Sequence, residues 1–459
     1  MALAAISLFS SGLTAQPGWD QAGGIMACIR TPEFPAREFA ITHYGAKPGE
    51  DCTAAIHAAI TACHDAGGGR VVVPSGIFLT GAIRLLSNVD LHLADGATLK
   101  FSTDPNAYLP VVATRWESTE CMNYSALIYA FGEENIAVTG SGTLDGSANA
   151  SNWWAWAANR GDEPSLAAPD AAALVRMGDQ NVPVASRVFG AGHYLRPNFF
   201  QAIRCRNVLV SDVTIVNSPM WELNPVLCTN VIARGVKISS HGVNNDGFDP
   251  ESCRDVLVDN CTFDTGDDCI AIKSGRNNDG RRIAARMENM IVRGCHMNGG
   301  HAGVAIGSET SAGCRNIFVE DCQMNSPILD RVLRIKSNAA RGGTIEGIYV
   351  RNIDVGQVAE AILTVDFLYE EGPKGNFPPV LRHVRFDHIT CSHCPRVLWI
   401  QNFRAATVDD IVLADSTLKG VQFPDLVVQA SKIEFDHVNI LPAVVGRSLH
   451  SRKGPGVDH

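Results

Sequence analysis

The stretch Asp255-Val-Leu-Val-Asp-Asn-Cys-Thr-Phe263 decides the fold, because its pattern recurs along most of the chain. The clearest other copies begin at Asn207, Asn230, Asn289 and Asn316. Less regular copies begin at Asn135, Gly347, His383, Asp410 and Lys432. Self-similarity of this kind is the sequence signature of a repeat architecture in which each unit packs on its neighbours.

Within each repeat unit, apolar residues stand at fixed positions after the first residue. They occur at +1, +3, +6 and +8, which in this copy are Val256, Val258, Cys261 and Phe263. Alternation at +1 and +3 is typical of a strand with one buried face. The frame then slips by one residue, which indicates a corner before a second strand. Asp, Asn and Gly are frequent at this corner and tolerate the left-handed backbone that a sharp turn needs.

From Asn207 onward, successive copies begin 22 to 36 residues apart. A strand, a corner, a second strand and a loop at this spacing make one coil of a parallel β-helix, with coils stacked about 4.8 Å apart. Only stacking buries the inner faces of such coils. A leucine-rich solenoid has a similar period, but its Leu/Asn motif is absent. We therefore predict an all-β, single-stranded, right-handed parallel β-helix over residues 16–447.

The N-terminal end of this solenoid is predicted to carry a capping α-helix. Residues 53–66 are rich in alanine, and their apolar side chains recur at helical spacing before Gly67-Gly68-Gly69 ends the helix. The first coils are expected at residues 71–73, 77–79 and 89–93.

The chain termini suggest processing and disorder. Residues 1–15 are apolar and end in Leu13-Thr14-Ala15, which suits a signal-peptidase site, although no Lys or Arg precedes Arg30. We expect a trimmed or mis-started signal peptide, and therefore a periplasmic or secreted protein. Residues 448–459 are expected to be a disordered tail.

Composition limits the partners of the protein. The net charge of −10 argues against nucleic acid, and no run of about 18 apolar residues indicates a membrane span. The oligomeric state stays open. Only Cys391 and Cys394 form a CxxC pair, and no second pair lies at zinc-ribbon spacing, so we predict no metal site at these cysteines.

Half of the 14 cysteines fall into two columns of the repeat. Cys261, Cys295 and Cys322 stand at +6, where the side chain faces inward. The other column, at −2, holds Cys205, Cys228, Cys253 and Cys314. We expect both columns to be stacked, buried, small apolar residues.

Charged residues gather in four consecutive coils. Asp246 follows Asn244-Asn245, the pair Asp267-Asp268 follows Gly266, His301 lies among glycines, and Arg334-Ile-Lys336 comes last. Asp267 and His301 are both at +12, so they should stack in adjacent coils. In a strand, Arg334 and Lys336 point the same way. We therefore expect these residues on one lateral face: Asp246, Asp267, Asp268, His301, Arg334 and Lys336.

This constellation suits glycoside hydrolysis. That reaction needs one carboxylic acid to protonate the leaving oxygen and one carboxylate to activate water. A third carboxylate raises the pKa of the acid by like-charge repulsion, and Arg and Lys can bind a uronic-acid carboxylate. Further arginines and lysines cluster in two loops, so an acidic protein could carry a basic cleft. These are Arg276, Arg281, Arg282 and Arg286, and then Arg331, Arg334, Lys336 and Arg341.

The same residues resemble glycoside hydrolase family 28, the polygalacturonases, whose fold is described as pectin-lyase-like. The family motifs Asn-x-Asp-Gly, Asp-Asp-Cys, Gly-His-Gly and Arg-Ile-Lys are matched at residues 244–247, 267–269, 300–302 and 334–336. The resemblance extends over about residues 39–440. Asn245 stands where the family has Thr, and Ala302 where it has Gly.

By that resemblance, Asp267 is the general acid and Asp246 and Asp268 activate the water. His301 keeps the acid in its working protonation state, and Arg334 and Lys336 bind the galacturonate carboxylate. The resemblance also implies inversion of configuration, no metal or cofactor, and a pectic polysaccharide or oligogalacturonide substrate. The residues alone do not choose which aspartate is the acid.

Exo action is favoured over endo action, since long loops can wall off one end of a cleft. The loop at residues 274–282 and the stretch at residues 153–197 interrupt the repeat, and residues 274–282 and 331–343 resemble exo-acting bacterial members. Trp116, Trp153 and Trp154 are either stacking platforms for sugar rings or packing residues.

Three other readings stay open. A pectate lyase would hold Ca²⁺ with its carboxylates and give an unsaturated product. A non-catalytic β-helix adhesin would have no need for this set of charged residues. A rhamnogalacturonan hydrolase would share the carboxylates, although Arg334 and Lys336 favour galacturonate.

Overall fold

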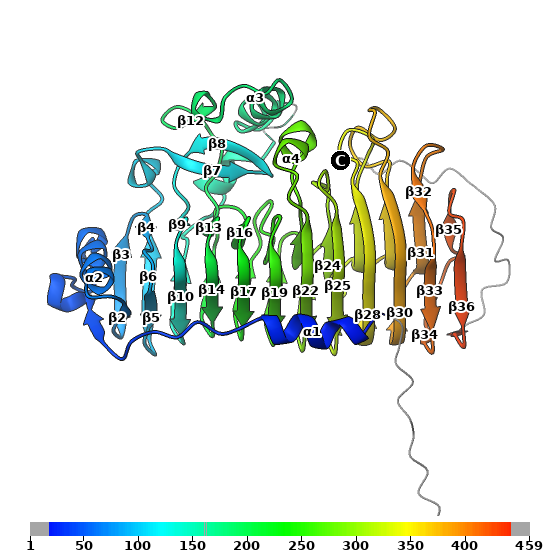
Figure 1. Ribbon diagram of the computed structural model, residues 1–459, viewed down its shortest axis with the longest axis horizontal. Helices are drawn as coiled ribbons and strands as arrows, with labels where there is room; N and C mark the ends of the chain where they lie inside the picture. The colour runs from blue at the N-terminus through cyan, green and yellow to red at the C-terminus, as the bar shows by residue number, and fades with distance from the viewer. Residues whose placement is uncertain (1–17, 160, 162, 442–459) are drawn as a thin grey trace, which may run out of the picture.

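The computed structural model describes residues 18–159, 161 and 163–441, which form a long solenoid of stacked coils (Figure 1). All strand pairs between coils are parallel, and a short hairpin above the solenoid supplies the antiparallel pair of the described residues. The predicted right-handed parallel β-helix is confirmed. Among the described helices, none is long and apolar enough to cross a membrane.

The two strands of the repeat unit form two ladders that fuse at the C-terminal end, where β28 and β30 each run through both. The ladder of first strands consists of β1 (Glu38–Ala40), β2 (Gly69–Val73), β5 (Val89–Leu93), β10 (Glu134–Gly140), β14 (Arg206–Ser211), β17 (Thr229–Arg234), β19 (Arg254–Asp259), β22 (Met287–Arg293), β25 (Cys314–Glu320), β28 (Thr344–Gln357), β30 (Val380–His393), β32 (Thr407–Val408), β33 (Ile411–Ala414) and β36 (Ile433–Asp436). The ladder of second strands adds β3 (Gly76–Thr80), β6 (Ala97–Phe101), β11 (Thr143–Asp145), β15 (Thr214–Val216), β18 (Lys237–Ser240), β20 (Thr262–Thr265), β23 (His296–Gly299), β26 (Gln323–Met324), β34 (Thr417–Lys419) and β37 (Asn439–Leu441).

A third ladder, which the sequence analysis missed, follows the loop of each coil. It consists of β4 (Ile83–Arg84), β9 (Ile128–Phe131), β13 (Phe200–Ile203), β16 (Leu223–Val226), β21 (Ile270–Ile272), β24 (Val304–Ile306), β27 (Arg331–Lys336), β29 (Ala361–Asp366), β31 (Arg396–Gln401) and β35 (Leu426–Val427). Bridges from Phe248 to Leu223 and to Ile270 join its two halves. The third strands were hidden because loops of different length precede them, so they hold no constant phase in the repeat.

The corners of the coils are made by residues in the left-handed region, as predicted. The residue at +5 has positive φ in every copy from Asn207 onward, for example Asp212 at 64° and Asn260 at 55°. The first residue of most units is also left-handed, and asparagine side chains there bond from coil to coil. Asn207 donates to Asn135 at 2.7 Å, and Asn230 donates to Asn207 at 2.8 Å. These bonds fix the register of one coil on the next.

The core runs along the inside of the solenoid and contains the apolar residues at +1, +3, +6 and +8. Both predicted cysteine columns are buried in it, and all cysteines of the described residues are free thiols. The backbone amide of Cys205 lies 3.4 Å from Cys228 Sγ, which confirms the stacking of the −2 column.

The predicted cap is helix α2 (Thr53–Asp65), whose apolar face closes the N-terminal end of the core. The predicted first coils match β2, β3 and β5. The remaining helices are α1 (Asp20–Cys28), α3 (Ala168–Asp179), α4 (Asn277–Ile283), and the 3₁₀ turns η1 (Ile41–Tyr44), η2 (Pro105–Tyr108), η3 (Trp153–Trp156) and η4 (Val184–Ser186).

The leader predicted at residues 1–15 and the tail predicted at residues 448–459 lie outside the described residues, so both stay predictions.

Above the solenoid, the antiparallel hairpin of β7 (Val112–Trp116) and β8 (Thr119–Asn123), extended by β12 (Val188–Phe189), lies beside α3 and α4 (Figure 1). At the opposite edge, α1 runs across the coils. Its Trp19 and Ile25 pack on side chains at the outward +2 position, among them Leu257, Ile291 and Phe318. The ladder of first strands is therefore partly buried on both faces, whereas the sequence predicted one buried face.

Replacing Trp19 by alanine should test this outer contact. Trp19 is 7% exposed and packs edge-on against Phe318 at 5.2 Å. We expect the free energy of unfolding in urea to fall by about 3 kcal/mol, as for buried aromatic residues generally. The control Ile77→Ala, at a side chain 54% exposed, should change it by less than about 1 kcal/mol. Equal effects of both changes would contradict the packing described here.

Candidate active site

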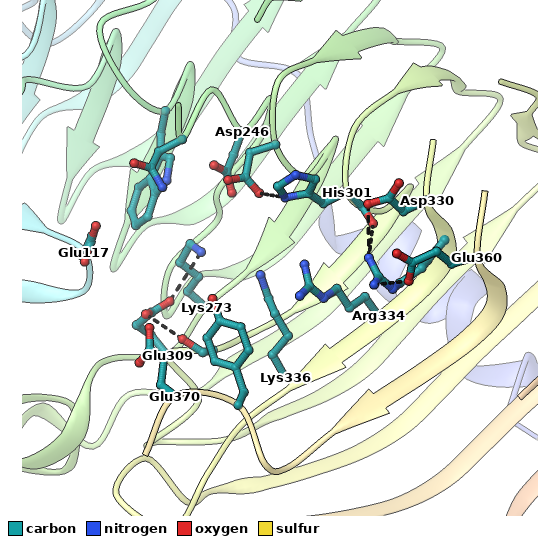
Figure 2. Close-up of a pocket in the computed structure, with 16 residues that line it drawn as sticks. Glu117, Asp246, Lys273, His301, Glu309, Asp330, Arg334, Lys336, Glu360 and Glu370 are labelled. Atoms are coloured by element: carbon teal, nitrogen blue, oxygen red, sulfur yellow. Dashed lines mark hydrogen bonds and ion pairs between the residues drawn. The ribbon is translucent and has the colours of Figure 1, made fainter. Parts of the chain in front are cut away.

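The predicted site residues converge at the third ladder, on its outer face. Asp246, Asp267 and His301 each stand just before a third strand, and Arg334 and Lys336 lie within β27. They surround a cavity of about 340 Å³ together with side chains from neighbouring coils and loops (Figure 2). Asp268 lies directly behind, fully buried.

The loop that carries Asp246 is fixed by its neighbour Asn245, which is fully buried. The Asn245 amide oxygen accepts from Ser240 Oγ at 2.9 Å and from the Gly242 amide at 2.6 Å. Its NH₂ group donates to the backbone carbonyls of Ser218 and Met220 at 3.0 and 2.9 Å. All hydrogen-bonding positions of this side chain are thus used to set the loop, which gives Asn245 a clear structural role where the family has Thr.

Asp267 and His301 make the contact that their shared phase predicted. His301 Nδ1 lies 3.0 Å from Asp267 Oδ1, and the His301 amide donates to the Asp267 carbonyl at 3.2 Å. The close approach depends on Gly300, whose φ is 135°, because a Cβ there would meet the Asp267 carbonyl oxygen at 2.2 Å. Ala302 has no left-handed backbone and packs against Ala271 and Ala305, so alanine is accommodated where the family has Gly.

The structure also brings the predicted cations, Arg334 and Lys336, to the site of the aspartates. Lys336 Nζ donates to Asp268 Oδ2 at 2.8 Å. Arg334 pairs in register with Ala305 of the previous coil, and the buried Leu333 and Ile335 on either side turn its guanidinium outward. Asp246, Asp267 and Asp268 each place one oxygen within 4.8 Å of the other two.

The three aspartates are not electrostatically equivalent. Burial, followed by the charge of Asp267, raises the pKa of Asp246 well above its usual value. Burial also opposes ionisation of Asp267, but the hydrogen bond and charge of His301 outweigh it and hold the pKa of Asp267 low. The same hydrogen bond raises the pKa of His301. The free site therefore keeps a proton on Asp246 and another on the Asp267–His301 pair.

Several functional side chains escaped the sequence analysis. Among them is the buried Lys273, which lies 3.4 Å from Glu309 and 3.6 Å from Asp249, with its ammonium group 4.5 Å from the centre of the Trp221 ring. The sequence feature that could have identified Lys273 is its position directly after the apolar third strand of the coil that carries Asp267. The other missed residues of the cavity wall are Glu117, Trp221, Asn244, Ser308, Glu309, Asp330, Glu360, Tyr369 and Glu370.

The expectation of a basic cleft is wrong. Seven carboxylates line the cavity against four lysines and arginines, and Lys273, Arg331 and Lys336 are each paired with a carboxylate. Arg331, Arg334 and Lys336 line it as expected. In the other loop, Arg281 packs on Phe377 and Arg282 pairs with Asp279.

The tryptophans predicted as possible sugar platforms are packing residues. Trp153 is buried between Tyr108 and Trp156, and Trp116 is buried with its ring N–H donating to the Arg196 carbonyl at 3.2 Å. Trp154 donates to the Ser218 carbonyl at 2.8 Å and stands against Gly242, in the loop that carries Asp246.

This arrangement can move protons to and from a bound ether or glycosidic oxygen. It combines a carboxyl that holds its proton, a carboxylate paired with a protonatable imidazole, and cations beside both. The aspartate oxygens could also ligate a cation, but Lys336 and His301 already bring positive charge to two of the three carboxylates.

Replacing Lys273 by methionine should show what the buried cation does. Methionine matches the length of the stem but leaves Glu309 and Asp249 without their counter-charge. We expect the protein to lose about 3–5 kcal/mol of unfolding free energy, as when one partner of a buried ion pair is removed. The control Lys419→Met, at an exposed lysine, should stay within about 0.5 kcal/mol. A Lys273→Met protein as stable as the control would refute this role.

Comparison with known proteins places the chain in a family. The model of glycosyl hydrolases family 28 matches residues 186–394. A solved exopolygalacturonase of Thermotoga maritima is 40% identical, with 93% of this chain and 96% of that chain covered and a TM-score of 0.89. Curated relatives include the exo-poly-alpha-D-galacturonosidase of Dickeya chrysanthemi, 29% identical over 72% of this chain, and the endo-polygalacturonase of Pectobacterium carotovorum, 27% identical over 66%.

The chain spans 53% and 57% of the lengths of the first curated relatives that it matches, and 68% of the Pectobacterium protein. With the Thermotoga enzyme, by contrast, the match is nearly complete on both sides. The fold, the carboxylate site and these similarities together lead to one conclusion: the chain belongs to glycosyl hydrolase family 28.

Proposed function

We propose that the protein is a galacturonidase that hydrolyses α-1,4 linkages of polygalacturonate from a chain end and releases galacturonic acid. The observation that carries this proposal is the contact of Asp267 with His301 beside Asp246 and Asp268, on the same face as Arg334 and Lys336. The 40% identity to an exopolygalacturonase over nearly the whole chain supports the substrate and the exo mode. Pectic polymers occur outside cells, which fits a periplasmic or secreted location.

In the proposed mechanism, Asp267 protonates the leaving oxygen, and Asp246 and Asp268 hold and deprotonate the attacking water. The free site keeps Asp267 ionised, so its proton must be supplied. His301 Nδ1 at 3.0 Å from Asp267 Oδ1 is the available donor. A proton that moves from the imidazolium to Asp267 leaves neutral histidine and a carboxylic acid, ready to protonate the leaving group.

The water-activating role requires Asp246 to lose its proton. Burial raises the pKa of Asp246 most, and the charge of ionised Asp267 raises it next. When Asp267 takes the proton of His301, that charge effect is removed and Asp246 ionises more easily. Lys336 donates to Asp268 Oδ2 at 2.8 Å and so places a cation beside the remaining carboxylate.

Inversion is the stereochemistry that the family resemblance implies. Inverting enzymes commonly hold their carboxyl groups about 6.5–9.5 Å apart and retaining enzymes about 5–5.5 Å apart. Here the nearest oxygens of the three aspartates lie within 4.8 Å of one another. We propose inversion because Asp246 and Asp268 form a pair that can hold water, whereas a retaining mechanism needs a single nucleophile.

Arg334 and Lys336 are proposed to bind the carboxylate of the sugar on the leaving-group side. Their cationic heads lie 5.8 and 5.6 Å from the centre of the Tyr369 ring, whose face can support a sugar. Exo action is proposed because the tip of the β7–β8 hairpin lines the cavity through Glu117, and this hairpin rises above the solenoid together with α3 and α4 (Figure 1). An endo-polygalacturonase is the main alternative.

Product analysis on polygalacturonate tests the proposal. We expect galacturonic acid as the sole product from the earliest times, with its β-anomer formed first in proton NMR spectra. Asp267→Asn should reduce kcat by at least about 10³-fold, as expected for loss of a general acid. Asp212→Asn is the matched control, since Asp212 is a corner residue at φ 64° that asparagine can replace.

Other outcomes would overturn parts of the proposal. A spread of oligomers at early times would establish endo action, and α-anomer formed first would establish retention. Loss of activity with a chelator, together with an ultraviolet-absorbing product, would identify a lyase. Cleavage restricted to rhamnose-containing pectin would identify a rhamnogalacturonan hydrolase, and absence of any cleavage would favour a binding protein.

The pH profile tests the proton supply from His301. Its pKa is raised by the bond to Asp267, so the protonated form persists above the usual histidine range and is lost as pH rises through the raised pKa. The alkaline limb of kcat should therefore lie above pH of about 6.5. His301→Gln should reduce kcat by about 10²-fold and move that limb to lower pH, where carboxyl groups titrate. The control His296→Gln, at an exposed histidine of the preceding strand, should leave the profile unchanged, and an unmoved limb in His301→Gln would refute the role.

A further inference from the structure

One end of the cavity is formed by the tip of the β7–β8 hairpin. The two tip residues, Glu117 and Ser118, have φ of 38° and 63°, as in a type I′ turn. Asn and Gly are the favoured residues in such a turn, so glutamate is a strained choice. The Glu117 side chain is 25% exposed and faces the cavity (Figure 2). A residue kept in an unfavourable conformation at a cavity wall indicates a functional side chain.

Glu117 forms a wall together with Arg276. The two side chains are paired at 2.9 Å, and Arg276 is only 12% exposed. Arg276 also lies 3.9 Å from Glu309 and 3.7 Å from Glu370, so carboxylates surround it. A second hollow of about 460 Å³, lined by α3 and Arg276, shares Glu117 with the catalytic cavity. The ion pair therefore separates the catalytic cavity from this second hollow.

The wall is held firmly from behind. The Glu120 amide of the hairpin donates to Asp279 of α4 at 2.9 Å, and Asp279 pairs with the buried Arg187 at 2.8 Å. The Arg276 amide donates to the Ser118 carbonyl at 3.3 Å. The hairpin tip and the loop before α4 thus form one rigid unit, and the position of the Glu117 carboxylate is fixed before substrate arrives.

Glu117 lies at the opposite end of the site from the proposed leaving-group side. Arg334 belongs to β27, and Glu360 borders the cavity one coil further toward the C-terminus. Figure 2 shows Glu117 and Glu360 on opposite sides of the catalytic residues. A sugar between Asp267 and Glu117 would be the terminal one, with the rest of the chain passing Arg334.

We infer that Glu117, positioned by Arg276, is the residue that recognises the free 4-hydroxyl of the terminal galacturonate and so makes the enzyme act at chain ends. This inference rests on the proposed function. An ionised carboxylate only accepts hydrogen bonds, and a free hydroxyl can donate one. An internal sugar carries the next residue on that oxygen, so it has no hydrogen to donate, and the added sugar would meet the Glu117–Arg276 pair.

The inference predicts selectivity between two kinds of chain end. Trigalacturonate with an ordinary terminus has the 4-hydroxyl, whereas trigalacturonate with a 4,5-unsaturated terminus, made by lyase cleavage, lacks it. A site built to bond a hydroxyl discriminates strongly against an analogue without it. For the wild-type protein we expect kcat/KM to be at least tenfold higher on the saturated trimer, with equal folding and assay conditions for both substrates.

Variants at Glu117 should remove this selectivity. Glu117→Ala should raise KM on the saturated trimer about tenfold, bring the two kcat/KM values within about threefold, and add digalacturonate to the early products of longer chains as the wall opens. Glu117→Gln keeps the size of the side chain and should lose only part of the selectivity. Glu120→Ala, on the same hairpin but paired with Arg204 and Arg282 away from the cavity, is the control and should behave like the wild type. Thermal unfolding of each variant checks the fold.

Each outcome of these measurements either supports or overturns the role of Glu117. Equal wild-type activity on both trimers, or full selectivity in folded Glu117→Ala and Glu117→Gln, would overturn the inference while leaving monomer release intact. Selectivity lost in Glu120→Ala as well would assign the effect to the hairpin as a whole and also overturn it. Absence of monomer release by the wild type would instead overturn the proposed function.

Discussion

Hydrogen-bonded register between successive coils is the constraint on which the rest of the structure depends. Each coil pairs residue by residue with the next, so the phase of a residue in the repeat fixes its height and direction on the solenoid. Asp267 and His301 meet because they occupy the same phase in adjacent coils. The left-handed corners and the asparagine bonds between coils maintain that phase over the whole length. Gly300 allows the backbones of these two coils to come close, because a Cβ at this position would clash with the Asp267 carbonyl oxygen.

The same register concentrates buried charge on one face. Asp246 and Asp249 share one coil and Glu222 lies in the coil before, and burial raises the pKa of each well above its usual value. Both carboxyl oxygens of Asp249 and of Glu222 are buried without a hydrogen-bond partner in the described residues. A folded protein tolerates such groups mainly where function requires them. The protonation of the carboxyl groups at the site therefore depends on how the coils stack, because each carboxyl shifts the pKa of the others.

The sequence predicted what the repeat determines directly and missed what long-range contacts determine. The two strands of each repeat unit and the contact of Asp267 with His301 follow from phase, and the cap α2 follows from helical spacing. Asp246, Arg334 and Lys336 were placed on the same face from their order in successive coils. The third ladder was missed because variable loops precede it. The outer contact of α1 was missed because the +2 residues look like the solvent face of a half-buried strand, and only the folded chain brings Trp19 onto them.

Lys273 and Glu117 are 156 residues apart yet line one cavity, which no local pattern reveals. The prediction of a basic cleft was wrong because the sequence does not show which charged residues pair in the folded chain. Arg276 and Arg282 are both paired with carboxylates from other segments.

An alternating row of charges connects the catalytic residues with the proposed chain-end wall. It runs from Asp249 through Lys273 and Glu309 to Arg276 and ends at Glu117, with successive groups 3.6, 3.4, 3.9 and 2.9 Å apart. Alternation lets each buried charge offset its neighbours, and Lys273 and Arg276 accordingly hold the pKa of Glu309 low despite its burial. Because Asp246 also feels Lys273, a change in charge at the wall can reach the aspartates through only a few contacts.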